Sequence, residues 1–182
     1  MTTARTRTIE DIVDRHLRDW AVEFPELDLA SEGVVERIQK LSRYFTKSCA
    51  ETAADYELTL GDWQILSALR RVGPPYELSP GKIADDLMLS PAAVTNRLDR
   101  LEQAGLVERR PDPSDRRALK VRLSVEGKRR WGAAVGAQGD RERRITDVLT
   151  DREKETLNKL LRKLMVQCEA IEGPVPPRRD DV

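Results

Sequence analysis

The sequence is poor in the residues that build metal sites and disulfide frameworks. Its 182 residues include one histidine, His16, and two cysteines, Cys49 and Cys168, which lie far apart. A single histidine provides no metal-ligand cluster, and two distant cysteines argue against a disulfide framework, so we expect neither a metal nor a cofactor. We expect both thiols to be buried as small hydrophobic side chains rather than to form a redox switch.

Long apolar segments and aromatic residues are also scarce. No apolar run approaches the roughly 18 to 20 residues that span a bilayer, and the polar start lacks the hydrophobic segment of a signal peptide, so we expect a cytoplasmic protein without a membrane partner. Aromatic residues make up 4% of the chain, which favours aliphatic helix packing over a β-sandwich. Neither a phosphate-binding loop nor a nucleophile motif occurs, and we expect no enzymatic activity and no catalytic residue.

What the sequence does contain is a series of helices with clear start and stop signals. Apolar residues at helical spacing predict a short helix that ends before Pro25, and a longer one that begins at Ser31 as its cap and runs to residue 57. Thr59 and Asp62 resemble a capping box for a third helix. We expect further helices over 125–145 and 151–171, and disorder at 1–8 and 173–182.

Two helix starts of the same kind lie close together. Ser79 followed by Pro80, and Ser90 followed by Pro91, each combine an N-cap with a first-turn proline. The first helix is short, and the second extends to about residue 104. This order predicts a helix-turn-helix, whose second helix presents small and polar side chains that suit a DNA groove. The residues expected on that face are Ser90, Pro91, Ala92, Thr95, Asn96 and Arg100.

The segment that follows combines a predicted hairpin with dense positive charge. Residues 106–110 predict a strand, residues 111–115 are rich in turn formers, and Leu119, Val121 and Leu123 give a second strand with one apolar face. Residues 97–130 contain eleven Lys or Arg and six Asp or Glu, a local net charge of +5 in a chain that balances 32 against 32. We interpret this hairpin as a wing that binds double-stranded DNA, in preference to a run of solvated surface charges.

The segment SPAAVTNRLDRLEQAGLVERRPDPSDRRALKVRLSVEGK resembles the MarR family of winged-helix transcription regulators, and the resemblance spans about residues 33–171. The family's wing carries an Asp-x-x-Asp-Arg-Arg-like signature, which Asp112, Asp115, Arg116 and Arg117 match. The resemblance implies that Asp115 orients Arg117, which enters the minor groove. It also implies a ligand-responsive repressor that binds a pseudo-palindromic operator as a homodimer built from the terminal helices.

The additional N-terminal helix resembles that of the urate-responsive subgroup of this family. There, this helix supplies a tryptophan to a ligand cleft, and two arginines lie in and just after the recognition helix; Trp20, Arg97 and Arg109 match these positions. Gln64 replaces the subgroup's acidic partner. The resemblance implies a small aromatic or anionic effector, with urate acting weakly or not at all, although Trp20 is equally well explained as a packing residue.

These patterns predict a mainly α fold with a small β-hairpin wing, an α+β winged helix-turn-helix flanked by N- and C-terminal dimerisation helices. We expect helices for the ligand cleft and dimerisation over 9–57, the DNA-binding domain over 58–124 and C-terminal dimerisation helices over 125–172. The alternative is a winged-helix module for protein interaction without sequence-specific DNA binding, because a fold alone does not assign a function.

Overall fold

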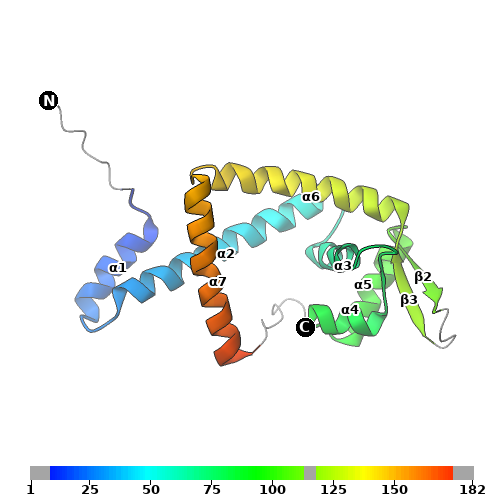
Figure 1. The fold of residues 1–182 in the computed structure, drawn as a ribbon, viewed down its shortest axis with the longest axis horizontal. Helices are drawn as coiled ribbons and strands as arrows, with labels where there is room; N and C mark the ends of the chain where they lie inside the picture. Colours follow the sequence, from blue (N-terminus) through cyan, green and yellow to red (C-terminus); the bar gives the residue numbers. More distant parts are fainter. Residues whose placement is uncertain (1–8, 113–117, 174–182) are drawn as a thin grey trace. The chain divides into compact units, whose positions relative to one another are not determined.

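The computed structural model describes residues 9–112 and 118–173, so the disorder predicted for 1–8 and 173–182 lies outside the described residues except at Gly173, which caps the last helix. Helices and one small sheet make up the fold (Figure 1), which confirms the mainly α class. The chain divides into two compact units, 1–47 and 48–182. The elements are α1 (Ile12–Glu23), α2 (Leu29–Asp55), α3 (Leu60–Arg71), β1 (Glu77–Leu78), α4 (Pro80–Leu87), α5 (Pro91–Gln103), β2 (Val107–Pro111), β3 (Leu119–Leu123), α6 (Val125–Thr146) and α7 (Asp151–Glu172).

The first unit pairs α1 with the first half of α2 through charged side chains. Arg37 of α2 donates from Nε to Asp11 Oδ2 at 2.9 Å and from Nη2 to Asp14 Oδ1 at 2.6 Å. His16 Nδ1 lies 2.5 Å from Glu36 Oε1, and this hydrogen bond holds the pKa of the Glu36 carboxyl below its ordinary value. These contacts fix the two helices against each other at their polar faces.

The start of α2 differs from the prediction. Ser31 does not cap the helix, because Asp28 lies three residues earlier and accepts hydrogen bonds from the backbone N–H groups of Ala30 and Ser31 at 3.1 and 3.2 Å. The helix therefore begins at Leu29. Aspartate and serine are about equally good N-caps, so residue type alone does not distinguish Asp28 from Ser31.

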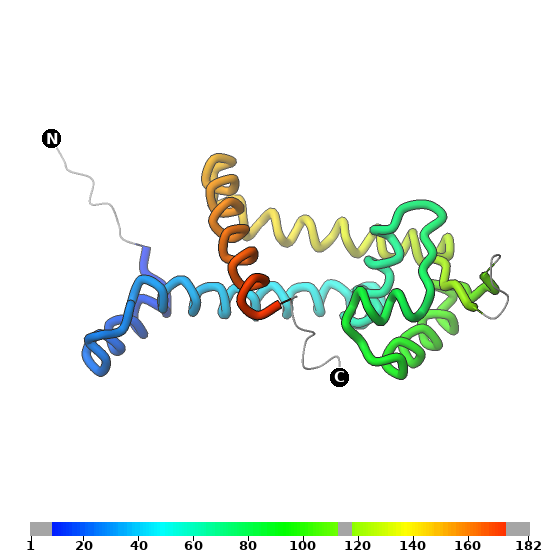
Figure 2. Tube along the Cα trace, turned by 60° about the horizontal axis from the view of Figure 1, so that its bottom comes forward, coloured from blue at the N-terminus to red at the C-terminus, as the bar shows by residue number. Residues whose placement is uncertain are grey.

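The helix-turn-helix forms as predicted, from local signals. Ser79 accepts from the backbone N–H of Lys82 and begins α4, and Ser90 accepts from Ala93 and begins α5. Met88 closes α4 in a left-handed conformation with φ of 51°, which turns the chain sharply before the second helix. Figures 1 and 2 show α4 and α5 in different directions at this turn.

The three strands form an antiparallel sheet in the order β1-β3-β2, with β1 before α4 and the hairpin of β2 and β3 after α5. The hairpin register pairs Arg109 with Val121 and Val107 with Leu123. Val121 and Leu123 are buried, as the alternating pattern predicts, whereas Leu119 is 47% exposed, so the predicted apolar face covers only the inner part of β3. The two-residue strand β1 was not predicted, because it is too short for an alternation to appear.

One hydrophobic core holds the winged part of the second unit together. Fully buried side chains from α3, α4, α5 and the sheet meet there, including Ile65, Leu66, Leu69, Ile83, Leu98, Leu101 and Val121. The start of α6 packs closely against this core, since a Cβ added at Gly127 would lie 2.1 Å from the carbonyl oxygen of Leu106. The core therefore fixes α5 and the hairpin relative to one another.

The last helix, α7, has no buried residue. Its cysteine is exposed and Cys49 is only half-buried, so the prediction that both thiols are buried was wrong for this chain. The reason is that the apolar side of α7, which carries Cys168, has no cover within the described residues of the second unit. Within residues 9–112 and 118–173, no helix is long and apolar enough to cross a membrane.

Candidate nucleic-acid interface

The recognition-helix candidate α5 has two sides of opposite character. Val94, Leu98 and Leu101 are each 1% exposed and pack into the core. The opposite side begins at Ser90, where the predicted groove-facing residues Pro91, Ala92, Thr95 and Asn96 are all exposed. Residues spaced three or four apart fall on the same side, as a helix of 3.6 residues per turn requires.

The first turns of α5 carry short side chains and hydroxyl groups that bond to the helix backbone, so another molecule can approach them closely. Ser90 Oγ accepts from the N–H of Ala93 at 3.2 Å, and Thr95 Oγ1 donates to the carbonyl of Pro91 at 2.9 Å. The hydroxyl groups thus satisfy the helix backbone, and the side chains of Pro91 and Ala92 are short. An exposed, small-residue helix start of this kind fits the major groove of DNA.

Arg100 differs from the other predicted groove residues because its guanidinium binds α3. Its Nη2 donates to Asp62 Oδ1 at 2.6 Å and to Thr59 Oγ1 at 2.9 Å. The Asp62 side chain is 5% exposed, whereas that of Arg100 is 51% exposed. Thr59 and Asp62 match a capping box in the sequence, but their contact with α5 joins distant residues and has no local sequence signal.

Arg97 also lies against the first turn of α3. It donates from Nη1 to Gln64 Oε1 at 3.2 Å, and a Cβ added at Gly61 would lie within 2.7 Å of its guanidinium carbon. The structure therefore brings together Gln64 and Arg97, two of the four residues predicted for the ligand cleft. A neutral amide holds the arginine where the related subgroup has an acidic residue.

Arg109, the third cleft candidate, ties the base of the hairpin to α5. Its guanidinium lies 2.6 Å from Asp99 and 2.9 Å from Glu102, and Glu102 also accepts from its backbone N–H at 3.0 Å. These two carboxylates were missed in the sequence, although their spacing of three residues puts them on one helix face. In this arrangement Arg109 fixes the angle between the recognition helix and the wing.

The described part of the wing ends at Asp112 and resumes at residue 118. Asp112 closes the hairpin there: its N–H donates to the carbonyl of Ala118 at 2.9 Å, and its carboxylate pairs with Lys120 at 3.4 Å. The predicted minor-groove residues Asp115, Arg116 and Arg117 lie outside the described residues. Their roles stay predictions.

Trp20, the fourth cleft candidate, belongs to α1 in the first unit. Its ring lies 5.4 Å from that of Phe24 at an angle of 51°, and 40% of the residue is exposed. An open hollow in the same unit is lined by Trp20, Phe24, Glu26, Leu27, Asp28 and Glu32. Packing with Phe24 accounts for part of the ring, so both interpretations of this tryptophan stay open.

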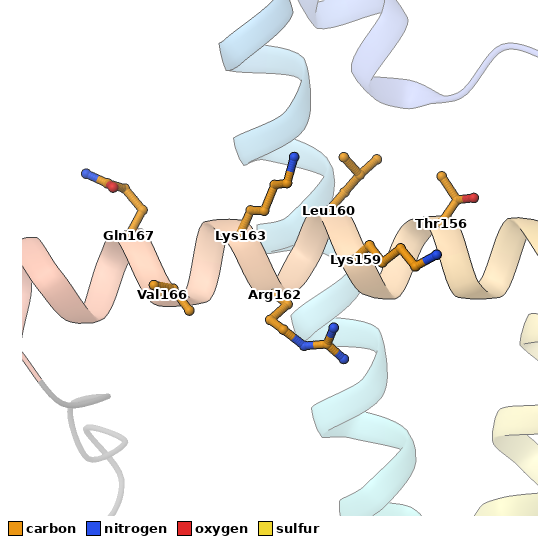
Figure 3. Close-up of a pocket in the computed structure, with 7 residues that line it drawn as sticks. All are labelled: Thr156, Lys159, Leu160, Arg162, Lys163, Val166 and Gln167. Carbon is orange, nitrogen blue, oxygen red and sulfur yellow. The ribbon is translucent and has the colours of Figure 1, made fainter.

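Two further features bear on ligands. A hollow on α7 is lined by that helix alone, and Figure 3 shows it beside Lys159, Lys163 and Gln167, with few apolar side chains; it lacks the enclosing walls of a small-molecule site. Among the described residues, no group of three or more His, Cys, Asp or Glu is placed to hold a metal ion.

Comparison with known proteins agrees with this geometry. The model of the MarR family matches residues 58–119. The HTH-type transcriptional regulator PecS of Dickeya dadantii is 34% identical over 158 residues, covering 87% of this chain and 93% of PecS. A mutant of the Escherichia coli MarR protein, solved with operator DNA, is 25% identical with a TM-score of 0.60, over 80% of this chain and 96% of that one. The regulator AbsC of Streptomyces coelicolor, 22% identical with a TM-score of 0.67 over 79% and 97%, shares the fold.

Proposed function

This chain belongs to the MarR family of winged-helix transcription regulators, and we propose that it is a ligand-responsive repressor that binds a pseudo-palindromic operator as a homodimer. In this proposal α5 enters the major groove and the wing arginines enter the minor groove. Repression follows because a dimer that occupies both grooves of a promoter excludes other proteins from it.

The observation that carries the proposal is the exposed polar side of α5 from Ser90 to Asn96. Its small side chains leave room for base edges, and the threonine and asparagine supply donors and acceptors. Because the opposite side is locked into the core, α5 docks as a rigid element. A winged helix specialised for protein contacts has no need of this polar face, which makes the protein-interaction alternative the weaker one.

The homodimer is supported by the apolar side of α7. Leu157, Leu161 and Leu164 are 44, 38 and 42% exposed in the single chain. A helix face of this size normally requires cover, and a second copy provides it with two-fold symmetry, which matches a two-fold operator. The recognition helices then lie about one DNA turn apart, roughly 10 base pairs from centre to centre.

Footprinting on DNA from around the protein's own gene tests this proposal. We expect a protected pseudo-palindrome with half-sites about 10 base pairs apart, and affinity that falls steeply with salt. Asn96→Ala should cost about 1 to 3 kcal/mol on the operator and little on unrelated DNA if the amide binds a base. Protection of one asymmetric half-site by a monomer would contradict the proposal, and salt-independent binding to a protein partner would favour the alternative.

For the effector we propose a small aromatic or anionic molecule that binds with Trp20, Gln64, Arg97 and Arg109. Support comes from the position of Arg97 on α5 and of Arg109 between α5 and the wing, because a ligand that changes either contact changes the DNA-binding surface. A tenfold loss of DNA affinity requires about 1.4 kcal/mol of coupling between the two sites.

Effector response is measured by displacement of labelled operator DNA. With Gln64 beside Arg97, we expect urate to release DNA weakly or not at all, and Gln64→Asp to strengthen any response. Trp20→Ala should abolish the response to the true effector. Release of DNA from the unmodified protein by low micromolar urate would contradict this assignment, as would an unchanged response of the Trp20→Ala variant.

A further inference from the structure

The contact between Arg100 and α3 is asymmetric in a way that points to a function beyond packing. The carboxylate of Asp62 is buried, whereas half of the Arg100 side chain is exposed. An ion pair with one partner largely in solvent contributes little as a brace between two helices, because water screens it. Here Nη2 of the guanidinium is bound to a buried carboxylate while about half of the arginine side chain stays exposed.

The acceptor that holds Arg100 is rigid. Asp62 Oδ2 accepts from the N–H of Thr59 at 2.8 Å and from its hydroxyl at 2.7 Å, which leaves Oδ1 for Arg100. The same two residues form the capping box of α3, and the next turns of α3 carry Ile65 and Leu66 into the core. These hydrogen bonds hold the carboxylate in one position, and the carboxylate in turn fixes the position of the Arg100 guanidinium.

Among the described residues, the hydrogen bonds of the Arg100 guanidinium leave some of its N–H donors unused. An arginine carries five N–H donors in one plane, and both hydrogen bonds of Arg100 leave from Nη2. Since the group is planar, fixing Nη2 also fixes the direction of Nε and Nη1. Nε and Nη1 do not share an edge of the guanidinium, but each donor is held in a fixed direction, and a preorganised charged donor suits a phosphate oxygen.

The position of Arg100 along α5 favours a phosphate over a base. In helix-turn-helix proteins the N-terminal residues of the recognition helix contact base edges, and Arg100 lies about 12 Å further along the axis than Ala92, at a rise of 1.5 Å per residue. We propose that Arg100 binds a backbone phosphate of the DNA and that Asp62 is its positioning residue. This inference rests on the DNA binding proposed above, and it replaces base recognition as the role of Arg100.

The proposal predicts an effect of neutralising Asp62 on DNA affinity that is opposite to the usual electrostatic effect. Removing a negative charge near DNA ordinarily strengthens binding, because the phosphates repel it. If Asp62 orients Arg100, Asp62→Asn should instead weaken binding, by about tenfold if one charge-assisted hydrogen bond is lost. Asp86→Asn is the matched control, since Asp86 pairs with Lys82 of its own helix α4 at 2.5 Å; the DNA affinity of this variant should stay the same or rise.

The experiment measures fluorescence anisotropy of the full chain with two labelled duplexes, the footprinted operator and a mixed-sequence duplex of equal length, from 50 to 200 mM salt. Arg100→Gln should weaken binding about tenfold on both duplexes. It should also reduce the slope of log affinity against log salt by about 0.9 for each recognition helix engaged. Arg100→Lys should keep the slope and recover only part of the affinity. Asp62→Asn added to Arg100→Gln should cause no further loss.

Two results would overturn the proposal. A loss confined to the operator, with an unchanged salt slope, would show that Arg100 binds a base; a lower melting temperature with unchanged affinity would show a brace only. If Asp62→Asn fails to fold, the two Arg100 variants decide the question alone. Failure of the unmodified protein to bind either duplex would instead refute the proposed function itself.

Discussion

The helices α5 and α7 have similar apolar patterns, but in the single chain the apolar side of α5 is buried and that of α7 is exposed. Val94, Leu98 and Leu101 of α5 are each 1% exposed, whereas Leu157, Leu161 and Leu164 of α7 are 38 to 44% exposed. Helical spacing of leucines therefore indicates that a face requires cover but not which element supplies it. For α5 the cover is the core of the winged part, and for α7 we propose a second copy of the chain.

The most severe test of this comparison is to make the uncovered face polar. Leu161→Asp combined with Leu164→Asp should dissociate the homodimer, because each lost leucine contact is worth about 1.5 to 3 kcal/mol and occurs in both copies. Sedimentation velocity should show a monomer with weakened operator binding. Val166→Asp is the matched control: it is an apolar residue of α7, 60% exposed and roughly 180° around the helix from Leu157.

The control should leave both the dimer and its operator affinity unchanged. A dimer that survives the double substitution on the leucine face would show that α7 does not form the interface. The apolar face would then need another explanation.

A second prediction compares equal substitutions on the covered and uncovered sides. Leu66→Ala in the core should lower the free energy of unfolding by about 2 to 5 kcal/mol, since a fully buried leucine leaves a cavity. Leu157→Ala should lower the free energy of unfolding of the winged part by less. Its effect should depend on protein concentration, because it acts through dimerisation. Urea unfolding at two protein concentrations measures both. Concentration-independent losses of equal size would remove the distinction between the two helices.

Local sequence patterns predicted contacts between neighbouring residues but not contacts between residues far apart in the chain. Capping signals at Thr59, Ser79 and Ser90 predicted helix starts correctly, because donor and acceptor lie within three residues of each other. The contact of Asp62 with Arg100 joins residues 38 apart, and no local pattern encodes it. The cap of α2 was misplaced for a different reason: Asp28 and Ser31 compete, and only their geometry decides.

The candidate DNA-binding site likewise contains local features that the sequence predicted and long-range contacts that it did not. The exposed residues of α5 followed from helical periodicity, whereas the contacts of Arg109 with Asp99 and Glu102 depend on how the hairpin folds back onto α5. Gly127 likewise carried no signal in the sequence, since its close contact with Leu106 is visible only once α6 is placed.

A third prediction compares two glycines of α6, one tightly packed at the first turn and one with open space around it. Gly127→Ala should destabilise the protein by about 1 to 3 kcal/mol, because the new Cβ meets backbone and the helix must shift. Gly132→Ala is the control, with nothing within 4 Å of its added Cβ; it should stabilise the protein by about 0.5 to 1 kcal/mol through helix propensity. Thermal melting checks both signs. Stabilisation by both substitutions would mean that α6 does not pack as closely as described.

The smallest expected effect concerns the charge of Glu126 in the first turn of α6. Glu126 accepts from Arg129 at 2.7 Å, and this hydrogen bond lowers the pKa of its carboxyl from 4.5 to about 2. Because the pKa in the folded state lies below that in the unfolded state, the stabilisation is present above about pH 4.5 and is lost as the pH falls towards 2.

Glu126→Gln should therefore lower the melting temperature slightly at pH 7, with a gap to the unmodified protein that narrows as the pH falls from about 4.5 towards 2. The gap should also shrink at high salt, since the pair is exposed and screened. Glu155→Gln on α7 provides the control for an exposed glutamate elsewhere. If the gap at pH 2 is as large as at pH 7, Glu126 acts by packing or local backbone geometry rather than by charge, and the attachment of α6 to the winged core depends on the close contact at Gly127.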